Sequence, residues 1–172
     1  MASVSWFAAP AHILPRRSTL RSFRRGPLES LSVSSRLASD EPWRSDMRAV
    51  DTNVVVRLIA RDDPRQTARA EAFVSKGAWV SHIVLVEVIG VLDLVFELSH
   101  KQLVTAVDML LNHRDLVLQD PALVTAALAR FRRRPRLGFS DCVVLESARK
   151  AGHVPLATFD KELGKLDDVE RL

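Results

Sequence analysis

The 172-residue sequence has a single cysteine and no long uninterrupted apolar run. With Cys142 alone, the chain can form neither an internal disulfide nor a cysteine-rich zinc site, so nothing in it requires an oxidising compartment. The most apolar stretch, residues 83–98, contains three acidic residues and is too short and too charged to span a bilayer. These absences predict a soluble, cytoplasmic protein that makes no use of a membrane.

Neither the histidines nor the net charge points to a particular function. The histidines after residue 47 show no HxxxH pair and no spacing typical of a catalytic set; they are His82, His100, His113 and His153. The formal net charge is only +4, which permits an anionic partner without requiring one. Hydrophobic residues at 47% and charged residues at 27% are typical of a globular chain.

The composition changes near Met47. Residues 1–46 contain ten of the fifteen serines, seven arginines and four prolines without any sustained periodicity, so we expect this extension to be disordered. It has three interpretations: an incidental segment before a true start at Met47, an organelle-targeting peptide, or a basic arm for nucleic acid. The first interpretation, an incidental segment before a true start at Met47, is favoured. Residues 47–172 are the predicted folded domain, long enough for one core.

Within the predicted domain, short apolar strands alternate with helical segments. This alternation is typical of a parallel α/β sheet flanked by helices. The predicted strands are residues 48–50, 78–80, 116–118 and 154–158, with a possible fifth at 169–172; the predicted helices are residues 54–60, 64–75, 83–98, 101–112, 121–131 and 140–152.

Four acidic residues occupy positions where carboxylates are expected to be functional. Asp51 and Asp160 directly follow predicted strands, and in a parallel sheet the carboxyl ends of strands form the ligand crevice. Glu87 stands in a helix with almost no polar face, where burial would cost several kcal/mol without compensation. Asp141 lies in the first turn of a helix behind Ser140, so Ser140 as N-cap and a dipole-stabilised Asp141 are the structural alternative; Asp160 could likewise be a cap.

Together these residues resemble the PIN-domain family, most closely the VapC-type ribonuclease toxins of bacterial toxin–antitoxin pairs. The resemblance covers residues 47–172 and implies a PIN-like parallel β-sheet flanked by α-helices, with the four acids converging in one pocket. The motifs, in family order and spacing, are Val50-Asp51-Thr52-Asn53, Glu87 in the central helix, Phe139-Ser140-Asp141-Cys142 and Thr158-Phe159-Asp160-Lys161.

The activity implied by the resemblance is metal-dependent hydrolysis of RNA. Clustered carboxylates repel one another, and Mg²⁺ relieves this with a preference for oxygen ligands; Mn²⁺ is a possible substitute. The resemblance assigns direct metal contacts chiefly to Asp51 and Asp141, with Glu87 and Asp160 completing the catalytic set. Attack by a metal-activated water requires no histidine or cysteine nucleophile.

Substrate contacts are expected from both polar and basic residues. Asn53 and Thr158 are candidates for orienting hydrogen bonds or phosphate contact, although a plain turn or cap role is as good an interpretation. Arg132, Arg133 and Arg134 belong to an arginine-rich segment, residues 130–136, just before the Asp141 motif. Guanidinium groups bind phosphate bidentately, but a solvated helix C-terminus would also favour basic residues.

The resemblance further implies two protein partners, a cognate antitoxin and a second copy in a homodimer. The apolar residues of 83–98, with Leu103, Val107, Leu110 and Leu111, exceed what one helix face needs to bury, so we expect them to form a groove for an antitoxin helix. The alternative is that these residues simply pack on the sheet.

Two other functions compete with the ribonuclease. A catalytically silent PIN module could act as an RNA-binding or interaction protein. A haloacid-dehalogenase-like phosphatase also begins with an aspartate after the first strand, but it normally needs a second aspartate two residues later, where this chain has Asn53.

Overall fold

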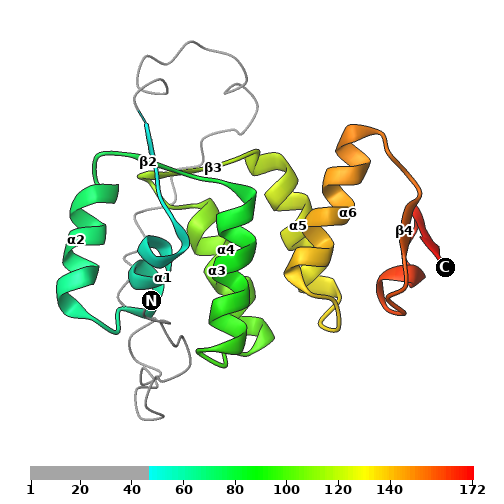
Figure 1. The fold of residues 1–172 in the computed structure, drawn as a ribbon, viewed down its shortest axis with the longest axis horizontal. Helices are drawn as coiled ribbons and strands as arrows, with labels where there is room; N and C mark the ends of the chain where they lie inside the picture. The colour runs from blue at the N-terminus through cyan, green and yellow to red at the C-terminus, as the bar shows by residue number, and fades with distance from the viewer. Residues whose placement is uncertain (1–46) are drawn as a thin grey trace, which may run out of the picture. The chain divides into compact units, whose positions relative to one another are not determined.

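The computed structural model describes residues 47–172, and the predictions for residues 1–46 lie outside the described residues. Strands and helices alternate as predicted (Figure 1). The elements are β1 (Arg48–Ala49), α1 (Thr52–Ala60), α2 (Pro64–Val74), β2 (Ala78–Val80), α3 (His82–Leu94), α4 (His100–Leu111), β3 (Leu116–Leu118), α5 (Pro121–Arg133), α6 (Phe139–Ala151), β4 (Leu156–Thr158), the 3₁₀-helix η4 (Leu163–Lys165) and β5 (Val169–Arg171).

Helices flank a parallel sheet, which confirms the predicted α/β class, but the strands fall into two separate sheets. One sheet has the order β1-β2-β3, and the other contains only β4 and β5. Both sheets are parallel; Trp79 of β2 stands between Ala49 of β1 and Val117 of β3, and Leu156 of β4 pairs with Val169 of β5. A single sheet of all the predicted strands does not form in the described chain.

Local sequence signals explain where the helices begin. Asp63 caps α2 by accepting hydrogen bonds from the backbone of its first turn, and Pro64 occupies the first helical position, where its missing N–H costs nothing. The side chain of Ser81 caps α3 in the same way. In α6 the predicted N-cap Ser140 is wrong: the helix begins one residue earlier, at Phe139, because Gly138 takes the extended N-cap conformation.

Helices α3 and α4 supply much of the hydrophobic core, and this corrects the predicted groove. Leu103, Val107 and Leu110 of α4 are buried, Leu110 with only 3% of its surface exposed, and Leu111 is half-buried. The three buried leucine and valine side chains therefore pack in the interior and are not available to a partner helix. The helix α3 ends at Leu94, four residues before the predicted end.

Some apolar residues in and just after α3 are not buried in the core. Ile83, Leu94 and Val95 are 79%, 82% and 63% exposed, while Leu85 and Val88 on the same helix are almost fully buried. An apolar surface on one side of α3 is therefore open in a single chain, and exposed apolar surface of this kind marks interaction sites.

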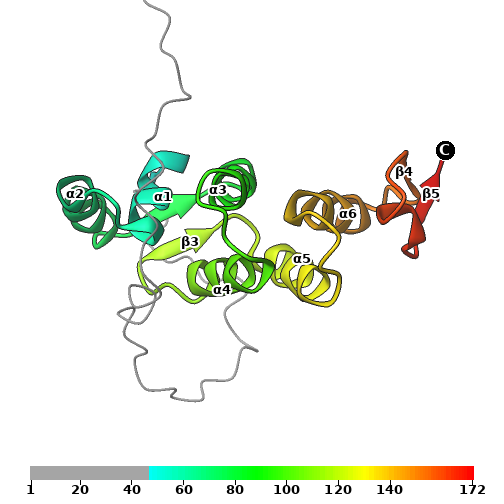
Figure 2. The same ribbon diagram turned by 90° about the horizontal axis from the view of Figure 1, so that it is seen from below.

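Helix α6 connects the two sheets and holds the smaller one. Glu146 of α6 accepts from Arg130 of α5 at 2.7 Å, and this ion pair is largely shielded from solvent. Arg149 of α6 reaches in the other direction, donating to the backbone oxygen of Asp167 at 2.8 Å and pairing with Asp168 at 3.0 Å just before β5. In Figures 1 and 2, α5 and α6 lie between the three-stranded sheet and the β4–β5 pair.

The core assignment of Leu110 gives a direct test. We expect Leu110→Ala to lower the free energy of unfolding by about 2–5 kcal/mol, because it removes buried methyl groups and leaves a cavity. The matched change Leu94→Ala, at an 82% exposed position, should cost less than about 0.5 kcal/mol. Urea denaturation followed by circular dichroism measures both, and equal losses would contradict the assignment.

Candidate active site

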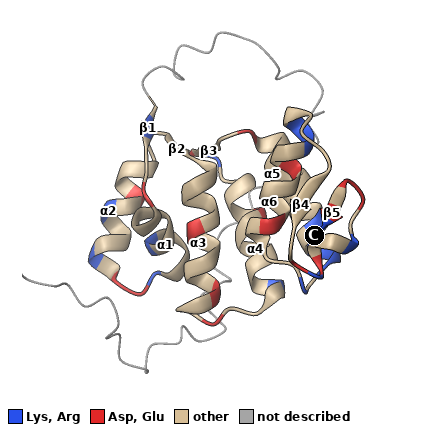
Figure 3. Ribbon diagram, turned by 45° about the vertical axis from the view of Figure 1, so that its right-hand side comes forward, with Lys and Arg blue, Asp and Glu red and all other residues tan. Residues whose placement is uncertain are grey.

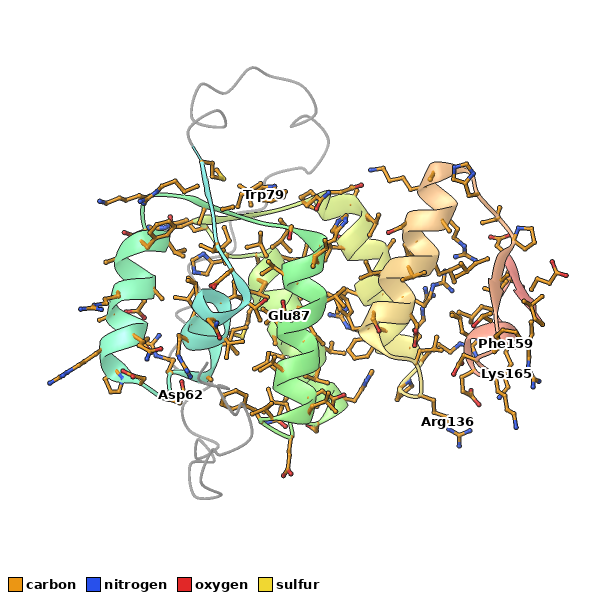
Figure 4. The ribbon with its side chains drawn as sticks, viewed as in Figure 1. Asp62, Trp79, Glu87, Arg136, Phe159 and Lys165 are labelled. Atoms are coloured by element: carbon orange, nitrogen blue, oxygen red, sulfur yellow. The ribbon has the colours of Figure 1, made fainter. Side chains whose placement is uncertain are left out.

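The first acidic position lies at the carboxyl end of β1. Asp51 is exposed and is the N-cap of α1, with its Oδ1 accepting the backbone N–H of Val54 at 3.0 Å. The buried neighbour Thr52 donates its hydroxyl to Oε2 of Glu87 at 2.6 Å. Thr52, the chain neighbour of Asp51, thus links the end of β1 to Glu87 of α3, which is labelled in Figure 4.

Glu87 itself is exposed rather than buried. The expected desolvation cost therefore does not arise, although the helix around it is apolar. One carboxylate oxygen is held by Thr52, and this short bond fixes the side chain on the face of α3 that packs near α1. Water-accessible carboxylates in a fixed position are suited to binding a cation.

The third predicted residue, Asp141, is half-buried in the first turn of α6. Its Oδ2 accepts the backbone N–H of Gly138 at 3.1 Å, which satisfies one of the free donors at the helix start. The capping interpretation of Asp141 is thus observed, with Gly138 in the place predicted for Ser140. The other carboxylate oxygen has no hydrogen bond described, so capping leaves it available.

The fourth, Asp160, is exposed beyond the end of β4. Its Oδ1 accepts the backbone N–H groups of Glu162 and Leu163, each at 2.7 Å, and so caps the turn that leads into η4. Thr158 accepts the backbone N–H of Asp160 at 3.0 Å. The turn interpretation of Thr158 is observed as well, and Phe159 between them is 78% exposed.

The predicted convergence of four acids is absent from the single chain. Within residues 47–172, no three histidine, cysteine, aspartate or glutamate side chains form a group able to hold a metal ion. Figure 4 places Glu87 and Phe159 on opposite sides of α5 and α6. The reason is the separate β4–β5 sheet, which carries Asp160 away from β1.

The arginine-rich segment is exposed from Arg132 to Arg136 at the end of α5. Arg132 pairs with Asp108 at 3.4 Å, and Arg133 donates to the backbone oxygen of Ala129 in its own helix. Arg134 is the C-cap residue of α5. Arg130 differs from these arginines because its ion pair with Glu146 joins α5 to α6 and is largely shielded from solvent.

Basic residues also surround the end of β4. Arg136 lies 4.0 Å from Glu162, two residues after Asp160, and Lys165 binds the same carboxylate at 2.6 Å. The hydrogen bond from Lys165, aided by the charge of Arg136, lowers the pKa of Glu162. Figure 3 shows basic segments around the C-terminus, where β4 and β5 lie. Asp160 therefore stands among charges of both signs, and both basic side chains already pair with Glu162.

Cys142 is a free, buried cysteine. Burial raises the pKa of Cys142 to about 11, so its thiol stays protonated and is no nucleophile. The rings of His100 and Phe131 are tilted by 60° with 4.3 Å between their centroids, and both border a cavity of about 280 Å³ between α3 and the start of α6. His82 belongs to the first turn of α3, where its backbone N–H binds Gln119.

Two residues that matter to the site were not singled out from the sequence. Thr52 belongs to the Val50-Asp51-Thr52-Asn53 motif without a role of its own in the prediction, yet its hydroxyl positions Glu87. Arg149 holds the β4–β5 pair on α6. The sequence does offer a signal for Thr52, because it is a polar residue between Asp51 and an apolar helix. It offers none for Arg149, because only the fold brings its partners near.

Comparison with known families identifies the domain. The PIN-domain profile matches residues 48–169, which include every acidic position described above. The chain belongs to the PIN family. Searches of curated proteins and of solved structures gave no match to this chain. PIN domains are generally nucleases that bind divalent metal ions and act on nucleic acid.

The membrane prediction was also tested. None of the helices in residues 47–172 has the length and apolar character needed to cross a bilayer.

The role of Thr52 can be tested by metal binding. Thr52→Val keeps the side-chain shape but removes the donor to Glu87, and loss of such a supporting hydrogen bond typically weakens metal affinity by about 10-fold. Thr52→Ser keeps the hydroxyl and should bind Mn²⁺ like the wild type. Isothermal titration with Mn²⁺ measures both, and unchanged affinity in Thr52→Val would show that the bond has no part in the site.

Proposed function

We propose that this PIN domain is a metal-dependent ribonuclease that hydrolyses phosphodiester bonds in RNA. The observation that carries the proposal is two solvent-accessible carboxylates near the carboxyl end of β1 in a chain of this family: Asp51, held by the backbone N–H of Val54, and Glu87, held by Thr52. This is the edge at which parallel α/β sheets bind ligands.

The donor chemistry fits a hard divalent cation. Asp51 and Glu87 offer only oxygen, and Mg²⁺ is commonly held by one or two carboxylates, with waters and substrate phosphates filling its other positions. Asp51 and Asp141 are the proposed direct ligands, with Glu87 and Asp160 in support. The bound ion would supply acidification of a water and charge stabilisation for hydrolysis. Mn²⁺ should replace Mg²⁺ at the same oxygens.

The protein's own residues orient the reactants. Thr52 keeps the Glu87 carboxylate in place, and the exposed Asn53 stands beside Asp51 in the first turn of α1, within reach of a substrate there. Arg132, Arg133 and Arg134 provide positive charge that offsets the repulsion between RNA and the carboxylates. Water adds to phosphorus and the departing ester oxygen takes a proton, so no covalent enzyme intermediate is needed.

The toxin role in a toxin–antitoxin pair belongs to the same proposal. Its support is the family and the exposed apolar side of α3, at Ile83 and Leu94. An amphipathic antitoxin helix could cover such a surface with its apolar face. Leu110 and its neighbours in the core are excluded from this contact by their burial.

One observation favours a second function, the catalytically silent PIN module that binds RNA or another protein. Asp141 and Asp160 both serve as caps, and no three acids cluster within the described chain. RNA binding without metal-dependent cleavage by the purified protein would support this alternative.

The catalytic proposal predicts the effect of Asp51→Asn. Asparagine is as good an N-cap as aspartate, so the fold should remain, while cleavage of a fluorescent RNA oligonucleotide in Mn²⁺ falls by about 100-fold or more. Asp63→Asn makes the same change at the cap of α2, outside the site, and should retain full activity. Full activity in Asp51→Asn would refute the assignment.

The proposed RNA contacts predict a change in salt dependence. Arg133→Ala combined with Arg134→Ala should weaken RNA binding and reduce the slope of log affinity against log salt by about 1–2. The control pair is Arg65→Ala with Arg69→Ala, on the exposed side of α2. Fluorescence anisotropy at several salt concentrations distinguishes them, and equal slopes in the two double variants would contradict the contact.

A further inference from the structure

We propose that the cavity between α3 and the start of α6 binds a single base of the RNA and that Asp93, which borders this cavity, makes guanine the preferred base. The inference rests on the proposed function and deepens it, because it names the base that is recognised beside the site of hydrolysis. RNA binding without metal is measured separately from cleavage, so the two proposals can fail independently.

The cavity adjoins two acidic residues of the candidate active site. On α3 it is bordered by Val86, one residue before Glu87, and by Gly90, three residues after it. Residues three apart on a helix are neighbours on its surface. On α6 the cavity is bordered by Ser140, which directly precedes Asp141. A molecule in the cavity would therefore lie beside carboxylates of the proposed catalytic set.

Gly90 leaves the wall of the cavity open, although glycine is among the least favourable residues inside a helix. It lies in the interior of α3, where no positive φ angle requires a glycine. A Cβ atom at this position would meet no atom within 4 Å beyond the adjoining backbone of its own helix. Packing within the chain therefore does not explain the missing side chain, whereas space for a ligand does.

The size and lining of the cavity suit a flat ring. Its volume of about 280 Å³ is just below the range of about 300–1,000 Å³ that is typical of small-molecule sites, so it suits one base better than a larger group. Bases that are splayed out of an RNA strand stack on aromatic side chains and are bound at their edges. The apolar side chains that border the cavity are Val86, Ile89, Leu103, Phe131, Leu137 and Phe139.

Two polar side chains that border the cavity have unused hydrogen-bonding capacity. Nε2 of His100 is buried and has no hydrogen-bond partner in the described chain. Buried polar atoms without a partner are rare because they cost free energy, and a ligand that reaches Nε2 would remove this cost. The Asp93 side chain is exposed, and no hydrogen bond or ion pair joins it to another residue of 47–172. Its carboxylate is therefore available to a ligand.

The carboxylate of Asp93 distinguishes among the four bases. An ionised carboxylate only accepts hydrogen bonds, and its two oxygens can accept two parallel ones. Guanine has two adjacent donors on one edge, N1–H and the 2-amino group. Adenine and cytosine have one amino group beside an acceptor nitrogen, and uracil has one N–H between two carbonyl oxygens. Guanine alone satisfies both oxygens of Asp93 without placing an acceptor against them.

The neighbouring charge favours RNA over a protein as the occupant. Pro135 borders the cavity from within the arginine-rich segment, and Arg133, Arg134 and Arg136 on either side of it are exposed. These guanidinium groups would bind the phosphates of a strand whose base enters the cavity. A basic protein segment, the other molecule that Asp93 would attract, would be repelled by the same arginines.

Binding of short RNAs in EDTA tests the cavity without metal or cleavage. The probes are a fluorescent five-nucleotide RNA of uridines and the same RNA with guanosine at its centre. The full-length wild-type protein should bind the guanosine-containing RNA at least about 5-fold more tightly, as expected for one bidentate contact to a base. In Asp93→Asn one acceptor becomes a donor, so this preference should be lost. Asp63→Asn, the same change at the cap of α2, should keep it.

Filling the cavity is a second test that leaves Asp93 intact. Gly90→Leu places a large side chain at the open wall, so the guanosine-containing RNA should bind only as well as the uridine RNA. Leucine is a better helix former than glycine, so circular dichroism and thermal unfolding should show a fold at least as stable as the wild type. Gly90→Ala adds only a methyl group and should keep the preference for guanosine.

Fluorescence anisotropy measures all of these affinities. Equal binding of the two RNAs by the wild type would overturn the inference and favour a protein side chain as the occupant. An undiminished preference for guanosine in Asp93→Asn or in Gly90→Leu would overturn it as well. A guanosine preference in EDTA without RNA cleavage in Mn²⁺ would refute only the proposed hydrolysis, whereas cleavage in Mn²⁺ with equal binding of both RNAs would refute only the base cavity.

Discussion

Hydrogen bonding between parallel strands decides where the acidic residues of this protein can meet. Each of Asp51 and Asp160 follows a strand by the same two-residue offset, so their distance depends on whether β1 and β4 are neighbours. In the single chain β1 and β4 are not neighbours, because β4 pairs with β5 and this pair is attached to α6 through Arg149. The wide spacing of Asp51 and Asp160 follows from this division.

Electrostatics explain why an incomplete site is stable in one chain. Four carboxylates in one pocket repel one another unless a cation is present. Here the carboxylates are satisfied separately: Asp51, Asp141 and Asp160 accept backbone N–H groups, and Glu87 accepts from Thr52. Bringing them together therefore requires a compensating gain, which a divalent cation would provide.

Much of the fold was predictable because its signals are local. The caps Asp63 and Ser81, the prolines that begin α2 and α5, and the apolar strands place most elements within a few residues. The start of α6 was missed because glycine, a less common N-cap, displaced the more favoured Ser140. The placement of Leu110 in the core also could not be read from the sequence, since helical spacing shows an apolar face without showing what it packs on.

The division into two sheets depends on long-range contacts that no local signal reports. Nothing in the sequence indicates that Arg149 pairs with Asp168 or that Arg130 pairs with Glu146. The family motifs predict the four acids as one set, but the sequence gives no indication that Asp51 and Asp160 follow strands of different sheets.

A crystal structure of the wild-type protein with Mn²⁺, with anomalous scattering used to locate the metal, tests the central claim most directly. The account predicts an anomalous peak within coordination distance of Asp51 and Asp141, with the Glu87 carboxylate beside it. A peak at other residues, or no metal at Asp51, would contradict it.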